Sequence, residues 1–185
     1  MKIRIVLEGA EDRFLWSRLL EDMGGGLSFS YYSAGEKNAA RPVARRLQVQ
    51  KHEPLLFIAD ADTNDPTAFA EQQASYVDYF RWTSAGVPFH VAFFQPESEI
   101  LFFRNPAIVE KELGLVLDPN QVWAAKVAPR KLLLSLLREK GADITGFISE
   151  LKADTISELR KDVDVSAVRG FLKRVRDSEA VLDMA

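Results

Sequence analysis

Short apolar runs alternate with longer amphipathic stretches over the first 105 residues of the chain. Runs of roughly four to eight apolar residues between turn-forming residues predict β-strands, and apolar positions that recur every three or four residues predict α-helices. Four such runs occur, within 2–9, 27–33, 54–59 and 88–95. Helical periodicity occurs between them, within 11–23, 37–50 and 67–84. This alternation predicts an α/β fold with a four-stranded, mainly parallel sheet flanked by helices.

The third run, "PLLFIA", is apolar at every position. A strand of a parallel sheet has this pattern when helices cover both faces of the sheet, because both sides of the strand are then buried. Trp16 and Trp82 lie on the helical stretches, and we expect both side chains to pack in the core.

From about residue 106 the periodicity becomes mainly helical. Helices are predicted within 130–141, 144–152 and 165–182, and one short strand is predicted within 121–127. We therefore expect residues 1–105 to form the α/β core and residues 106–185 to form a mainly helical extension that packs on it.

The composition narrows the chemistry that the chain can perform. Its 185 residues are 47% hydrophobic, which is enough for one sizeable core. It has no cysteine and only two histidines, so disulfides and thiolate metal sites are excluded and a zinc enzyme is disfavoured. Any metal site must use oxygen ligands. The net charge of −3 is unlike that of a protein coated with basic residues, so contacts with nucleic acid must be local or assisted by cations.

The chain has no obvious targeting or membrane segment. The apolar run at the N-terminus, Ile5 to Leu7, is far shorter than the core of a signal peptide. No window approaches the roughly 18 consecutive apolar residues of a membrane span. We expect a cytoplasmic protein that does not contact membranes.

Acidic residues follow three of the four predicted strands. The acids at these strand ends are Glu8, then Asp60 and Asp62, then Glu97 and Glu99. In an open parallel sheet, ligands bind at the carboxyl ends of the strands. Strand alternation would place Asp60 and Asp62 on one side, where their carboxylates would repel each other unless a cation bound them. Mg²⁺ or Mn²⁺ suits such hard oxygen ligands.

Turn and capping chemistry is the alternative explanation for these aspartates. The segment "DTNDPT" is rich in turn formers, and aspartate after a strand often caps the next helix. We expect this simpler role for Asp65, which precedes Pro66.

Three stretches of the sequence resemble the TOPRIM domain family. In "IRIVLEGAEDRFLWSRLL" an apolar strand ends in Glu-Gly and an aspartate follows on the next helix, as in the opening of TOPRIM domains. "LLFIADADTND" resembles their D-x-D strand end. "FFQPESEILFF" resembles the later P-x-x-E stretch of TOPRIM domains of the overcoming-lysogenization-defect type and of small stand-alone TOPRIM-like proteins of prokaryotes. The resemblance covers roughly residues 2 to 104 and implies a Rossmann-like fold.

The resemblance also implies phosphodiester chemistry on DNA or RNA that depends on Mg²⁺ or Mn²⁺. By position, Glu8 matches the glutamate of the first strand, which is a metal ligand or a general acid/base. Asp60 and Asp62 match metal ligands, and Glu99 matches the later acidic ligand, with Glu97 as the alternative. In nuclease members, two metal ions would activate water and stabilise the leaving oxygen.

Asp12 matches the family's helix aspartate, which would lie behind the metal ligands. The chain contains no domain that would supply the catalytic tyrosine of a topoisomerase and no zinc region of a primase. A small metal-dependent nuclease is therefore expected, acting alone, as a homo-oligomer or with a partner ATPase. In prokaryotes such proteins often resemble parts of phage-defence systems.

Basic residues in the second half are candidates for contacts with phosphate. Lys131 is expected near the acids, where its charge would stabilise a phosphate; the alternative is a solvated residue at the start of a helix. Arg169, Lys173 and Arg176 share one face of the last predicted helix. This face either follows a nucleic-acid backbone or is an ordinary solvated surface.

Three other functions compete with the nuclease. A phosphatase of the haloacid dehalogenase type would use Asp60 as nucleophile and Asp62 as general acid/base, with Asp162 and Asp164 as its late acidic pair, but it leaves Glu8 unexplained. A phosphorylatable receiver domain would use the strand-end aspartate with Lys126, but it lacks the paired acids after the first strand. The third is a catalytically inactive TOPRIM-like binding or regulatory subunit.

Overall fold

A computed structural model describes residues 1–35 and 37–182 of the chain. Four parallel strands form one sheet in the order β2-β1-β3-β4. The strands are β1 (Lys2–Leu7), β2 (Ser28–Ser33), β3 (Leu55–Asp60) and β4 (Phe89–Phe94). All four lie where the apolar runs predicted them, and the parallel sheet confirms the predicted α/β class.

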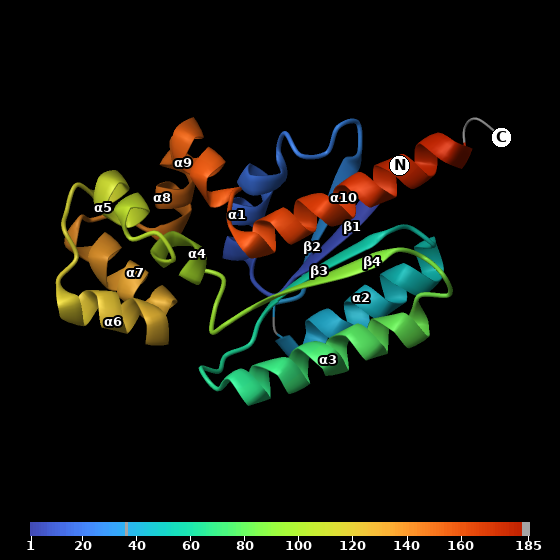
Figure 1. Cartoon of the computed structure of the whole chain (residues 1–185), viewed down its shortest axis with the longest axis horizontal. Helices are drawn as coiled ribbons and strands as arrows, with labels where there is room; N and C mark the ends of the chain where they lie inside the picture. The colour runs from blue at the N-terminus through green and yellow to red at the C-terminus, as the bar shows by residue number, and fades with distance from the viewer. Residues whose placement is uncertain (36, 183–185) are drawn as a thin grey trace.

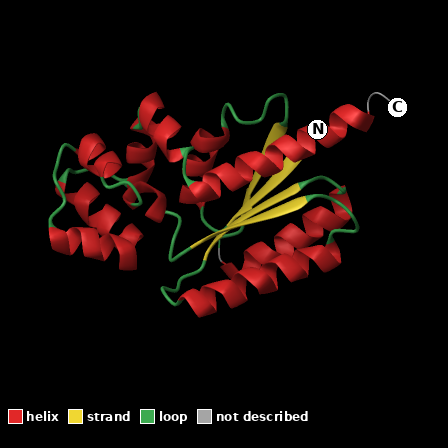
Figure 2. Ribbon diagram, in the orientation of Figure 1, coloured by secondary structure: helices red, strands yellow, loops and turns green. Residues whose placement is uncertain are grey.

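Helices cover both faces of the sheet (Figure 1, Figure 2). Helices α2 (Lys37–Lys51) and α3 (Pro66–Thr83) pack on one face, and α1 (Ala10–Leu20) and α10 (Val163–Leu182) lie along the other. Alternate side chains of β3 divide between the two layers: Phe57 packs with the α2 and α3 layer, whereas Leu56 packs with the α1 and α10 layer. Burial on both sides explains why this strand is apolar throughout.

Six short helices gather beyond the carboxyl ends of the strands, on the left of Figure 1. They are α4 (Ile100–Phe103), α5 (Ala107–Leu113), α6 (Pro119–Val127), α7 (Pro129–Glu139), α8 (Ile144–Glu150) and α9 (Ala153–Leu159). One continuous cluster of buried side chains joins these helices to α1, α10 and the sheet. No described helix is long and apolar enough to cross a membrane.

The strand predicted within 121–127 is wrong, because this segment is helix α6. Asp118 caps the helix: its Oδ1 accepts hydrogen bonds from the backbone N–H groups of Asn120 and Gln121, at 2.7 and 2.9 Å. The Gln121 side chain accepts a bond from the Asp118 N–H in return, which completes a capping box, and Pro119 occupies the first helical position. These start signals favour a helix over the short apolar pattern that suggested a strand.

The two tryptophans that were expected in the core differ in burial. Trp16 is fully buried and packs at a tilt against Phe94, with ring centroids 5.7 Å apart. Trp82 is 87% exposed on the last turn of α3, so the prediction for this residue is wrong. Helical spacing identifies a face but not whether another element covers it.

Candidate active site

The acids predicted at the strand ends lie along the carboxyl edge of the sheet. Glu8 follows β1 directly, and Asp60 is the last residue of β3. Beyond the end of β3 the backbone N–H of Ala61 donates to the Phe94 carbonyl (2.8 Å), and that of Asp62 donates to the Pro96 carbonyl (2.9 Å). These bonds hold the segment after β4, which carries Glu97 and Glu99, against the end of β3.

Ser98 links two of the acids directly. Its backbone N–H donates to Asp60 Oδ1 (2.8 Å) and its hydroxyl donates to Asp12 Oδ1 (3.1 Å). The other oxygen of Asp12 accepts from the Gly9 N–H (3.0 Å), and a Cβ at Gly9 would stand only 3.0 Å from that oxygen. A larger residue after Glu8 would therefore require the Asp12 carboxylate to shift. Ser98 is buried, and sequence reasoning did not single it out.

The carboxyl groups of this cluster are difficult to ionise. Burial, followed by the charges of Asp12, Glu99 and Glu8, raises the pKa of Asp60 to about 9. Burial raises the pKa of Asp12, and raises that of Glu99 to about 7 against the opposing effect of Arg130. Asp12, Asp60 and Glu99 thus share one electrostatic environment, and in the absence of a cation it disfavours their charged forms.

Arg130, at the start of α7, is the cation that contacts this cluster. Its guanidinium donates to Glu99 Oε1 (2.9 Å) and to the carboxylate of Glu11, and its backbone N–H donates to Glu97 Oε2 (3.0 Å). Sequence reasoning selected the neighbouring Lys131, whose side chain is exposed and lines a hollow beside Arg130. The contacts of Arg130 therefore identify a functional candidate that the sequence did not.

Glu99 has one carboxylate oxygen that its surroundings leave unsatisfied. The residue is only 3% exposed, and its Oε2 is buried without a hydrogen-bond partner among the described residues. A buried acceptor without a partner costs about 1–3 kcal/mol, and more if it is charged. A hard cation would satisfy this oxygen, so the chemistry of the acids fits Mg²⁺ or Mn²⁺.

The acids are held in their present positions by other residues. Within residues 1–35 and 37–182, no group of three or more His, Cys, Asp or Glu side chains already has the arrangement of a metal site. Asp60 and Asp12 are held by Ser98, and Glu99 is held by Arg130. Metal binding therefore requires some of these side chains to move closer together than they lie here.

The second aspartate of the D-x-D motif is placed differently from the first. Strand β3 ends at Asp60, and Asp62 has a left-handed backbone conformation with a φ of 53°. Strand alternation therefore stops before Asp62, whose side chain is exposed, whereas Asp60 is partly buried. Asp65 accepts bonds from the backbone N–H groups of Thr67 (2.7 Å) and Ala68 (3.4 Å), which confirms its predicted role as the cap of α3.

The basic face of α10 lies at the other end of the sheet. Arg169, Lys173 and Arg176 line a hollow of about 300 Å³ together with Arg160 and the residues that follow α1, Asp22 and Met23. Helix α1 runs from the carboxyl edge of the sheet back to the amino edge, where β2 begins. The structure thus brings these three cations together, but not with the acids.

Asp162 and Asp164, the late acidic pair of the phosphatase hypothesis, both contact Arg104. Arg104 binds Asp162 at 2.7 Å and Asp164 at 2.7 Å. These contacts give both aspartates a structural role in holding the start of α10 to the segment after α4.

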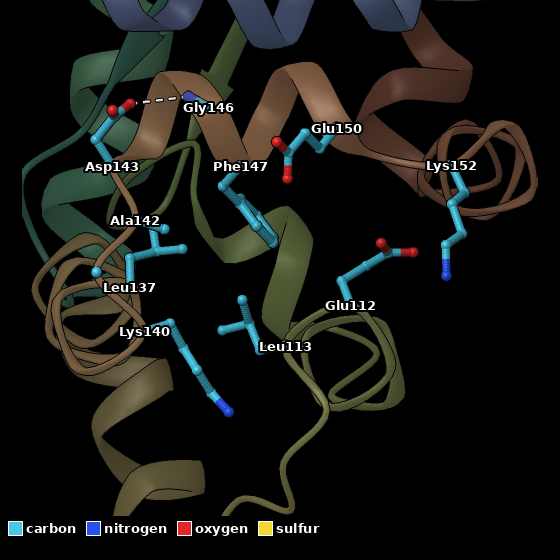
Figure 3. A pocket seen from close by; sticks show the side chains of 11 residues that line it. Glu112, Leu113, Leu137, Lys140, Ala142, Asp143, Gly146, Phe147, Glu150 and Lys152 are labelled. Carbon is cyan, nitrogen blue, oxygen red and sulfur yellow. Dashed lines mark hydrogen bonds between the residues drawn. The ribbon is translucent and has the colours of Figure 1, made fainter.

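A larger cavity, of about 540 Å³, lies among the short helices (Figure 3). Its lining carries both charges: Glu112, Glu150 and Lys152 lie on one side of Phe147, and Lys140 lies on the other side and points away from them (Figure 3). Glu112 accepts a hydrogen bond from the Thr155 hydroxyl, so part of the polar lining stabilises the fold. None of the strand-end acids lines this cavity, whereas Glu97 lines a smaller hollow at the sheet edge.

No protein-family model and no curated protein sequence matches the chain. One solved structure is similar: the C-terminal region of the Xanthomonas campestris pv. campestris OLD protein. The two chains share 16% sequence identity and superpose with a TM-score of 0.51, over 100% of this chain and 98% of the other. At this identity the likeness establishes a common fold, and it extends over the helical half as well as the sheet.

Proposed function

We propose that the chain is a divalent-metal-dependent nuclease that hydrolyses phosphodiester bonds in DNA or RNA. The observation that carries the proposal is the cluster of Glu8, Asp12, Asp60 and Glu99, whose shared burial and charge call for a cation. The unsatisfied Oε2 of Glu99 supports it. The similarity in fold to the OLD protein region is consistent with a nuclease of this type.

Each acid has a role in this proposal. Glu8, Asp60 and Glu99 would hold Mg²⁺ or Mn²⁺, and Asp62, whose side chain is exposed, would complete the ligand set. The bound metal would polarise the phosphate and lower the pKa of the attacking water. Asp12 and Ser98 would position Asp60 through their hydrogen bonds.

Arg130 is expected to matter more than Lys131. The variant Arg130→Gln should lower kcat about 100-fold, because it removes a cation aimed at the site where charge develops on the phosphate. It should also lower the Mg²⁺ concentration for half-maximal rate, because Glu99 loses its competing partner. Lys131→Gln should change kcat only a few-fold. Mg²⁺ titrations of both variants measure the two effects, and equal losses in the two variants would contradict the assignment.

The proposal is tested by incubating the protein with labelled DNA, RNA and a small phosphate ester, in Mg²⁺, Mn²⁺ or EDTA. The nuclease predicts cleavage of nucleic acid that requires metal and is lost in Glu8→Gln. Ester turnover that survives Glu8→Gln would favour the phosphatase. Absence of turnover with every substrate, together with metal-independent binding of nucleic acid, would favour the inactive binding subunit.

A further inference from the structure

Trp123, on α6, presents a large aromatic surface to solvent. Its side chain is 67% exposed, and it borders an apolar groove of about 320 Å³ between α6 and α7. Val127 and Leu132 contribute apolar walls to this groove, and Val127 is itself exposed. An exposed tryptophan beside other exposed apolar groups is typical of a binding surface.

The groove adjoins the acids. Asn64, in the loop after the D-x-D motif, donates its side-chain amide to the Val127 carbonyl (3.0 Å). In Figure 1 the end of α6 points toward this loop between β3 and α3. A second hollow, of about 380 Å³, shares Lys131 and Ser135 with the groove and reaches Glu97 and Arg130. A continuous surface therefore runs from Trp123 past Lys131 to Arg130, which binds Glu99.

Positive charge lies along this surface. Arg130, Lys131 and Arg138 all line the second hollow, next to the apolar groove. An aromatic platform beside a row of cations has the two features that nucleic-acid strands require: a face for a base to stack on and charges for its phosphates. A protein partner with an apolar anchor would use the aromatic face but would leave the cations unmatched.

We propose that the groove holds a nucleobase of a single strand, stacked on Trp123, with the adjoining phosphates on Lys131 and Arg138. The inference rests on the proposed nuclease function and names the form of its substrate: a strand with at least one unpaired base next to the bond that is cut. Arg130 then lies between the stacked nucleotide and the acids.

Trp82 provides a matched control, because it is also an exposed tryptophan but sits on the last turn of α3, at the opposite edge of the sheet. The probe is a fluorescently labelled oligothymidylate of about 12 nucleotides, within the length that such grooves cover, mixed with the protein in EDTA so that no cleavage occurs. Anisotropy should show about tenfold weaker binding for Trp123→Ala, the loss expected for one stacked base. Trp123→Phe should restore most of the affinity, and Trp82→Ala should bind like the parent protein.

A second readout separates this proposal from the nuclease. In Mg²⁺, Trp123→Ala should raise KM for the oligothymidylate with little change in kcat. If the parent protein cleaves but Trp123→Ala and Trp82→Ala behave alike, the stacking site is overturned and the nuclease stands. If no cleavage occurs but Trp123→Ala still loses binding, the nuclease is overturned and the stacking site stands. If Trp123→Ala instead dissolves a dimer seen by sedimentation and leaves oligonucleotide binding unchanged, the groove holds a second copy of the chain and the proposal is wrong.

Discussion

Replacing Asp60 by asparagine is expected to abolish cleavage and, at the same time, to stabilise the metal-free protein at pH 8. Activity should fall at least about 1000-fold, because the amide cannot supply the negative charge that binds the metal and because the bound metal activates the water. Stability should rise because the amide keeps an oxygen for the Ser98 N–H, whereas Asp60, whose pKa the fold raises to about 9, must bind a proton when the protein folds at pH 8. The gain should be on the order of 2 kcal/mol, or roughly 4–8 °C in Tm for a chain of this size.

Asp65→Asn is the control for this experiment. It makes the same chemical change five residues away, at an exposed cap where asparagine is as good as aspartate. Cleavage rates in Mg²⁺ and thermal unfolding in EDTA should therefore be unchanged in Asp65→Asn. An Asp60→Asn variant that is both inactive and less stable than the parent would show that the aspartate has a structural role and would contradict the metal site.

Loss of cleavage together with a gain in stability distinguishes a functional cluster from a structural one. A carboxylate that stabilises the fold has its pKa lowered by its partners, as the ion pair with Lys111 does for the carboxyl of Asp154. The pKa of the Asp60 carboxyl is raised instead, although Ser98 donates a hydrogen bond to it. Strongly perturbed groups that cost stability concentrate at functional sites.

The sheet was predictable because its signal is local. The run of β3 is apolar because helices bury both faces of the strand. It can be recognised in the sequence without knowing which residues cover it. Helix α6 was missed because apolar residues alternate too weakly over seven positions to identify a period, although the Asp118-Pro119 start was visible in the sequence. Trp82 was misplaced because its exposure depends on which elements pack on α3.

The acids at the strand ends were also predictable, because parallel strands bring their carboxyl ends to one edge of the sheet. Ser98 and Arg130 were not, since the contacts that reveal them join residues 31 to 119 positions apart. The local geometry of Asp62 was missed for a different reason: alternation predicts its direction only while the strand continues, and β3 ends at Asp60. Residues that are recruited by tertiary contacts require the structure.

Raising the pH should destabilise the metal-free protein, and Mg²⁺ should reverse this. The pKa of Asp60 rises from 3.8 to about 9 on folding, and that of Glu99 from 4.5 to about 7. At a pH between the unfolded and the folded pKa of each carboxyl, the folded state binds more protons than the unfolded state. The free energy of unfolding therefore falls as the pH rises. The loss should begin near pH 4 and be largely complete by about pH 9.

Thermal unfolding in EDTA from pH 5.5 to pH 9 measures this loss, which should be smaller in Asp60→Asn than in the parent protein or in Asp65→Asn. Mg²⁺ at about 100 times its dissociation constant should restore about 2.7 kcal/mol, since it binds the folded state alone. The benefit should grow with pH, because the acids must lose their protons to hold the metal. A Tm that rises with pH in EDTA, or a Mg²⁺ effect as large at pH 5.5 as at pH 9, would mean that this cluster neither resists ionisation nor binds the cation.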